Sequence, residues 1–99
     1  MVNISHRVSI RSRDDRRVVR MIDKLAKHNG IQTIKVKLIE ELHEAIEAIE
    51  SNDEVDIIEE LADVNILTEQ YLALKMKRFE YDKMREFKIE RTMKRLGVE

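Results

Sequence analysis

Apolar side chains recur every three or four positions along most of this chain, which is the period of an amphipathic helix. The first stripe predicts a helix from Ser12 to Asn29, because Gly30 readily takes the left-handed conformation that follows a helix. Its apolar positions are Val18, Val19, Ile22, Leu25 and Ala26. The second stripe predicts a helix from about Thr33 to Glu50. Its apolar positions, which we expect to face the core, are Ile39, Leu42, Ile46 and Ile49.

The third helix is predicted to begin near residue 52, because Ser51 and Glu54 form an S-x-x-E capping box. It is apolar on nearly every face, which is typical of a central, buried helix. Its apolar residues are Val55, Ile57, Ile58, Leu61, Ala62, Val64, Ile66, Leu67, Leu72, Ala73, Leu74 and Met76.

A fourth helix is predicted over residues 82–96, with Asp82 as its N-cap and Gly97 as the residue that ends it. Its apolar positions are Phe87, Ile89, Met93 and Leu96. The four stripes together predict an all-α fold in which residues 12–99 form a single four-helix domain.

The first ten residues follow a different pattern, since apolar residues and a histidine alternate with polar ones. The alternating positions are Val2, Ile4, His6, Val8 and Ile10. A period of two is a strand signal. We therefore expect residues 1–11 to form an extended or disordered N-terminal arm.

Composition limits the class of protein further. The chain has 99 residues, of which 42% are apolar and 39% charged, and it contains no Pro and no Cys. A domain of this size has a marginal core, so self-association would help it bury more surface. The lack of Cys excludes disulfides and Cys-based zinc sites. No apolar run reaches the roughly 18 residues of a membrane span, and no signal-peptide core is present, so we expect a soluble, cytoplasmic protein without membrane contact.

The net charge of −1 conceals a segregation of charge. Residues 1–20 hold six Arg against two Asp, and residues 75–95 hold nine Lys or Arg against four acids. Residues 40–63 hold eleven acids and no Lys or Arg. The basic ends could bind nucleic acid, surround an anionic ligand held at the acidic centre, or pair with the acidic helices. Nucleic acid is the weaker interpretation, because aromatic residues for base stacking are nearly absent.

Two short motifs stand out within the acidic stretch: Glu41-Leu42-His43-Glu44 and Glu60-Leu61-Ala62-Asp63. Residues three apart share a face of a helix, so two antiparallel helices could point four carboxylates into one space. Like charges that close destabilise one another unless a cation lies among them, and Mg²⁺ prefers oxygen ligands. A solvated acidic surface is the alternative. The small residues Ala45 and Ala48 beside this face indicate the close approach of another helix or a ligand.

Other catalytic chemistries find less support in the sequence. Glu40 and His43 have the Glu-x-x-His spacing of di-iron bundles, but that architecture needs the motif twice, and neither His6 nor His28 follows a Glu by three. No motif for a Ser or Cys nucleophile is present. The divalent-cation site therefore remains the main catalytic hypothesis.

The two acidic segments, K-L-I-E-E-L-H-E-A and E-E-L-A-D-V-N-I-L-T-E-Q, resemble those of the MazG-like all-α nucleoside triphosphate pyrophosphohydrolases. The signature of that family is E-x-x-E, a spacer and E-x-x-D. The tail F-K-I-E-R-T-M-K-R-L is similar to the basic last helix of small phage-type members. The resemblance covers residues 33–96. The segment 2–10 matches nothing in the family, and Asn65 stands where an apolar residue is expected.

The resemblance implies a four-helix unit that pairs into homodimers or homotetramers and hydrolyses a (deoxy)nucleoside triphosphate to monophosphate and pyrophosphate. Its cofactor would be Mg²⁺, for which Mn²⁺ can substitute. The metal ligands carried over by position are Glu41, Glu44, Glu60 and Asp63. Glu40, beside Glu41, is the spare carboxylate that could act as a base or position water. The candidates for phosphate contacts, each also explicable as a bundle salt bridge, are Lys37, Lys88, Arg91 and Arg95. The rival is a non-catalytic helical interaction or regulatory protein on the same scaffold.

Overall fold

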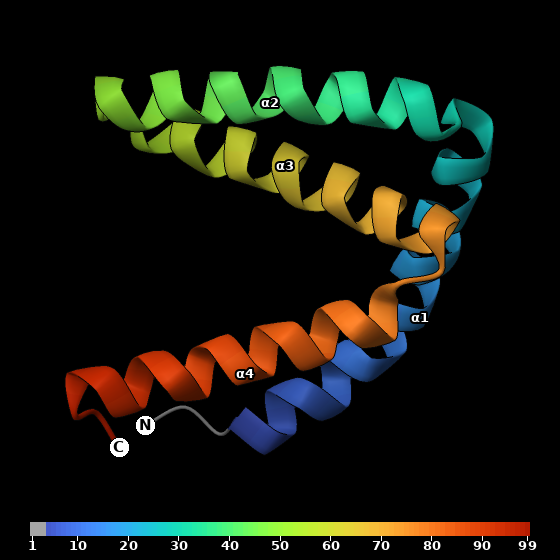
Figure 1. Ribbon diagram of the computed structural model, residues 1–99. Coiled ribbons are helices and arrows are strands. Elements are labelled where there is room, and N and C mark those ends of the chain that lie inside the picture. Colours follow the sequence, from blue (N-terminus) through green and yellow to red (C-terminus); the bar gives the residue numbers. More distant parts are fainter. Residues whose placement is uncertain (1–3) are drawn as a thin grey trace.

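The computed structural model describes the backbone of residues 4–99 and the side chains of residues 16–99. Four helices follow one another through short turns (Figure 1): α1 (Ile4–Asn29), α2 (Ile31–Ser51), α3 (Glu54–Lys75) and α4 (Arg78–Leu96). Residues 4–99 contain no strand, so the predicted all-α, four-helix class is confirmed. Within the same residues, no helix is long and apolar enough to cross a membrane.

The predicted start of the first helix differs from the observed one. Helix α1 begins at Ile4 rather than Ser12, so residues 4–11 are helical and not extended. The alternating pattern misled because positions 4 and 8 are also one helical turn apart, and such a pair fits either period. Residues 1–3, the rest of the expected arm, lie outside the described residues.

The turn between α2 and α3 reverses the chain without the predicted capping box. Asn52 takes a left-handed conformation with φ 61, and Asp53 is the N-cap of α3. The Asp53 side chain accepts hydrogen bonds from the N–H groups of Val55 (3.1 Å) and Asp56 (3.3 Å). Ser51 still belongs to α2, where its hydroxyl donates to the Ala48 carbonyl at 2.8 Å. The N-cap of α3 therefore lies at Asp53, two residues after the predicted Ser51, because the chain turns at Asn52.

The turn between α3 and α4 also differs from the prediction, since α4 begins at Arg78 and Asp82 lies inside it. Met76 is left-handed, with φ 55. The Lys77 N–H donates to the Leu72 carbonyl at 3.0 Å, which closes the turn with backbone groups alone. No Gly or Pro marks this turn, so the sequence held no local signal for it. Gly97 ends α4, as predicted.

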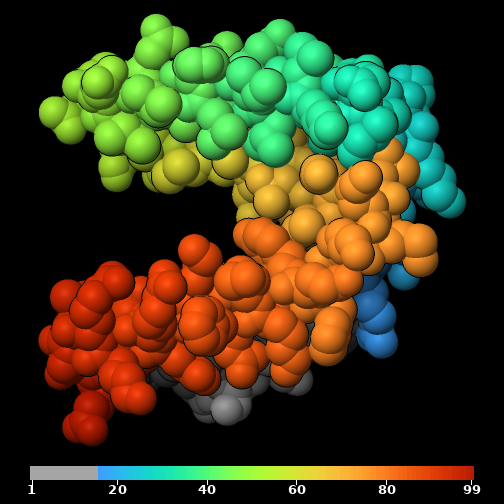
Figure 2. All heavy atoms as spheres, viewed as in Figure 1, coloured from blue at the N-terminus to red at the C-terminus, as the bar shows by residue number. Residues whose placement is uncertain are grey.

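The helices α2 and α3 form an antiparallel hairpin, and α1 packs against both of them. At the backbone level, helix α4 contacts α3 but neither α2 nor residues 16–29 of α1. Figure 1 shows α3 and α4 diverging from the turn that joins them, and Figure 2 shows the molecule hollowed between the hairpin and α4. Among residues 16–99 the buried residues are few: Ile22, Ala26, Ile34, Ala45, Ala48, Leu67 and Gln70.

The predicted core stripe of α2 is not buried. Leu42 is 46% exposed and Ile46 54% exposed, whereas Ala45 and Ala48 are buried against α3. Small side chains allow two helices to approach closely, so the alanine face packs and the isoleucine stripe points elsewhere. The predicted close approach at Ala45 and Ala48 is confirmed. Helix α3 is central, as expected, because it contacts each of the other three helices. The expectation that it is buried is wrong, since Leu67 and Gln70 are its only buried residues.

Candidate metal centre

Three carboxylates face one another across the α2–α3 hairpin. One oxygen from each of Glu41, Glu60 and Asp63 lies within 4.8 Å of the other two. Helix period explains the arrangement, because Glu41 lies one turn before the buried Ala45 on the α3-facing side of α2. Glu60 and Asp63 lie on the same side of α3 as the buried Leu67. The close alanine contact therefore brings the carboxylates together.

Two of these oxygens are shielded from water. The Oε2 atoms of Glu41 and Glu60 are buried, and no hydrogen-bond partner for either is found in the described part of the chain. Two ionised carboxylates cannot hydrogen-bond to each other, so the pair can form such a bond only when one of them holds a proton. A shared proton or a cation would therefore stabilise this pair.

The same proximity shifts the titration of the pair. The hydrogen bond to Glu60, burial, and the negative charges of Glu44 and Asp63 raise the pKa of Glu41 from 4.5 to about 8. The pKa of Glu60 is lowered by the hydrogen bond from Glu41, but burial together with Glu44 and Asp63 outweighs that effect and raises it. The two groups exchange one proton, so the raised values describe the pair as a unit.

The other predicted ligand and the spare carboxylate are more exposed. Glu44 lies outside the group of three, yet it is close enough to raise the pKa of both Glu41 and Glu60. Glu40 is exposed beside Glu41, and His43 is exposed and does not join the group. Exposed residues are free to turn toward a ligand, whereas the three clustered carboxylates are already in place.

The predicted phosphate contacts fall into two regions. Lys37 is exposed on α2, one turn before Glu41. The remaining three, Lys88, Arg91 and Arg95, are exposed on α4. At 3.6 residues per turn they share one face of α4, within about 60° of one another. Within residues 16–99 the backbone of α4 does not contact α2, and no ion pair joins these bases to the carboxylates.

The residues present fit a magnesium ion. Neighbouring ligands of octahedral Mg²⁺ are about 3.0 Å apart and opposite ligands about 4.2 Å apart, and side-chain rotations would bring the three oxygens, which lie within 4.8 Å of one another, to such spacings. The two shielded oxygens and the raised pKa values are what a carboxylate site shows before a cation balances it. A fully solvated acidic surface would not shield these atoms.

Sequence reasoning missed two side-chain contacts that hold the helices around this centre. The Asn29 side-chain amide donates to Gln70 Oε1 at 2.8 Å, and Gln70 is only 3% exposed. An Arg78 guanidinium nitrogen, Nη2, donates to Asp23 Oδ1 at 2.9 Å. The partners lie 41 and 55 residues apart, so no local pattern could have paired them.

The fold and the centre define an all-α protein with a carboxylate site on a helical hairpin. Comparison with family models agrees with this class: the model described as "MazG nucleotide pyrophosphohydrolase domain" matches residues 29–96. These residues contain all of α2, α3 and α4 and every clustered carboxylate. The chain therefore belongs to the MazG nucleotide pyrophosphohydrolase family. No curated protein and no solved structure matches the chain.

Proposed function

We propose that this protein is a Mg²⁺-dependent hydrolase that converts a nucleoside or deoxynucleoside triphosphate to the monophosphate and pyrophosphate. The observation that carries the proposal is the group formed by Glu41, Glu60 and Asp63, which lies inside the segment that matches the family. A cytoplasmic location is part of the proposal, since nucleoside triphosphates are made and used there.

The clustered carboxylates, together with Glu44, would hold the Mg²⁺. The bound ion would supply positive charge to the triphosphate and offset the negative charge that grows on the phosphate under attack. Glu41 would lose the proton it shares with Glu60 when the site is loaded, because metal-ligating carboxylates are ionised. Glu40, exposed beside Glu41, would orient the attacking water or accept its proton.

The basic residues would bind the phosphate chain. Lys37 is one turn from Glu41 on α2 and is the nearest base on the same helix. The basic face of α4, made of Lys88, Arg91 and Arg95, carries three positive charges that no described ion pair uses. A triphosphate carries several negative charges, so these side chains would add affinity and orientation rather than chemistry.

The proposal includes assembly into a homodimer or homotetramer. Its support is an apolar flank of the hairpin, which we define as Ile39, Leu42, Ile46, Ile49 and Leu61, each about half exposed. Leu61 lies on this flank because it is two turns before Thr68, which lines the same apolar groove of about 320 Å³ as Ile39 and Leu42. Soluble monomers rarely expose so continuous an apolar surface. Two copies packed flank to flank would form a symmetric four-helix bundle.

The test of the activity is pyrophosphate release from a panel of ribo- and deoxynucleoside triphosphates, measured with Mg²⁺ and with chelator. We expect release from at least one nucleotide, with Mg²⁺ or Mn²⁺ and not with chelator. Glu47→Gln serves as the matched control, since Glu47 is an exposed acid of α2 outside the cluster and its loss should leave the rate unchanged. No release from any nucleotide would favour the non-catalytic interaction protein instead.

A further inference from the structure

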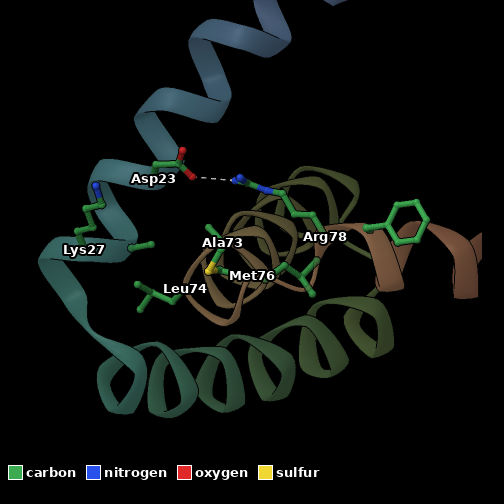
Figure 3. A pocket seen from close by; sticks show the side chains of 9 residues that line it. Asp23, Lys27, Ala73, Leu74, Met76 and Arg78 are labelled. Atoms are coloured by element: carbon green, nitrogen blue, oxygen red, sulfur yellow. Dashed lines mark hydrogen bonds and ion pairs between the residues drawn. The ribbon is translucent and has the colours of Figure 1, made fainter.

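Helix α4, which carries three of the candidate phosphate contacts, has few attachments to the rest of the chain. Among residues 16–99 its backbone contacts α3 alone. Among the side chains of those residues, one hydrogen bond joins it to another helix: Arg78, the first residue of α4, donates from Nη2 to Oδ1 of Asp23 on α1 at 2.9 Å (Figure 3). The other ion pair of α4, between Lys77 and Glu80, is local and exposed.

The surroundings of the Asp23–Arg78 pair make it more than a surface contact. Asp23 lies beside the buried Ile22 and one turn before the buried Ala26, so α1 holds it in place. The Nε atom of Arg78 is shielded from water and has no hydrogen-bond partner among the described residues. If Asp23 were lost, a partly desolvated guanidinium would remain without an acceptor, which costs more than loss of an exposed pair.

A cavity lies beside the pair, so the packing around the start of α4 leaves a gap there. It has a volume of about 390 Å³, and Figure 3 shows side chains of its wall around the Asp23–Arg78 bond. Its wall is formed by Asp23, Ala26, Lys27, Leu72, Ala73, Leu74, Met76, Arg78 and Phe79. The turn before α4 passes through Met76, a left-handed residue that is not Gly. This turn and the ion pair therefore both help to set the tilt of α4.

Small changes of that tilt become large at the far end of the helix. Lys88 and Arg95 lie ten and seventeen residues beyond Arg78, or about 15 and 25 Å at the helical rise. A rotation of about 10° at Arg78 would move Arg95 by roughly 4 Å, which exceeds the distance over which a hydrogen bond to phosphate survives.

We propose that the Asp23–Arg78 pair is a clasp that sets the tilt of α4 and so positions Lys88, Arg91 and Arg95 for the triphosphate. Asp23 and Arg78 are positioning residues and do not themselves touch phosphate. The link to substrate rests on the proposed function, whereas the link to the tilt of α4 does not. Because both side chains remain about one-third or more exposed, at 41% and 35%, salt should loosen the clasp.

The tilt can be measured directly, because the chain has no Cys of its own. Glu47 of α2 and Glu90 of α4 are both exposed; each is replaced by Cys and spin-labelled, and the labelled chains are diluted with unlabelled protein. We expect one narrow distance distribution in the parent and a broader or shifted one in Asp23→Asn and at high salt. Exchange of the two charges, Asp23→Arg with Arg78→Asp, should restore the narrow distribution. Lys77→Ala, which removes the neighbouring exposed pair, should leave it unchanged. Superimposable distributions for Asp23→Asn and its parent would overturn the clasp.

Kinetics then test the role in binding. Asp23→Asn should raise KM for the hydrolysed nucleotide about two- to fivefold and leave kcat nearly unchanged, since α4 would bind ground state and transition state alike. The charge exchange should restore KM, and Lys77→Ala should not alter it. A changed distance distribution with an unchanged KM would overturn the positioning role. An unlabelled wild type that hydrolyses no nucleotide would overturn the proposed function, and the distance measurement would still decide whether the clasp exists.

Discussion

The two sides of the α2–α3 hairpin are opposite in character. On one side Glu41, Glu60 and Asp63 lie so close that the pKa of Glu41 rises to about 8. On the other side the apolar flank leaves large side chains such as Ile46 half exposed. The two sides are separated on α2 itself, where Glu44 lies about half a turn from Leu42 and Ile46.

The comparison shows two different kinds of incomplete surface on one hairpin. Crowded carboxylates are stabilised by a cation, which restores charge balance. An exposed apolar flank is stabilised by removal from water, which a second copy of the same flank provides. A variant that affects one side should therefore leave the other intact, and each of the following predictions uses that independence.

The largest effect is expected at the carboxylates. Glu41→Gln or Asp63→Asn should abolish hydrolysis, because each removes a charged ligand from the cluster. Helical circular dichroism and the light-scattering mass should stay unchanged, since neither side chain belongs to the apolar flank. A variant that retains more than about a tenth of the activity, equal to roughly 1.4 kcal/mol of barrier, would exclude that residue as a ligand.

The next effect is on assembly. The parent should scatter light with at least twice the monomer mass of 11.8 kDa at micromolar concentration. Leu42→Glu with Ile46→Glu should return the mass to that of the monomer, because charges of the same sign would be buried without partners at the interface. Val36→Lys is the control, since Val36 is an exposed apolar residue of α2 outside the flank. A parent mass near 11.8 kDa would contradict the proposed oligomer.

A smaller effect is expected of Mg²⁺ on the thermal stability of the protein. At a Mg²⁺ concentration about ten times Kd, linkage adds about 1.4 kcal/mol to the free energy of unfolding. In a domain this small, that should raise Tm by roughly 5 to 10 °C. NaCl at matched ionic strength should do less, because it only screens charge. Glu60→Gln should raise the Tm of the metal-free protein and reduce its response to Mg²⁺. Equal shifts from the two salts would show that the carboxylates form no specific site.

The smallest effect is the pH dependence of the metal-free protein. The pKa of Glu41 is about 8 in the folded protein and 4.5 in the unfolded chain, so the folded protein binds the proton more tightly. Stability from this group is therefore present below pH 4.5 and is lost as pH rises through about 8. In chelator, Tm should fall further in the parent than in Glu41→Gln between pH 5 and pH 9. Parallel profiles for the two proteins would contradict the shifted pKa.

Much of the site could be predicted from sequence because its motif is local. Glu41 and Glu44, like Glu60 and Asp63, are three residues apart, and the helical period alone places each pair on one face. The short turn after α2 then makes an antiparallel arrangement the simplest one. The role of small residues was also readable, since Ala45 and Ala48 mark the face where a helix approaches.

The predictions that were wrong share a cause. The spacing of apolar residues along a helix does not show which other helix, if any, packs against them. The isoleucine stripe of α2 is a regular apolar face, yet its exposure depends on which face α3 takes. Asp53, rather than Ser51, caps α3 because the chain reverses at Asn52. The start of α4 at Arg78 is set by backbone bonds around Met76, which carry no residue signature.

The sequence by itself determined that this protein is helical and which carboxylates lie on a common face, because helices are built from bonds between residues four apart. Tertiary structure alone decided that the Oε2 atoms of Glu41 and Glu60 are shielded and that α4 diverges from the hairpin. It also decided that Arg78 forms an ion pair with Asp23, which is 55 residues away in the sequence. Desolvation and charge coupling depend on distances between helices, and those distances follow from how all the faces pack at once.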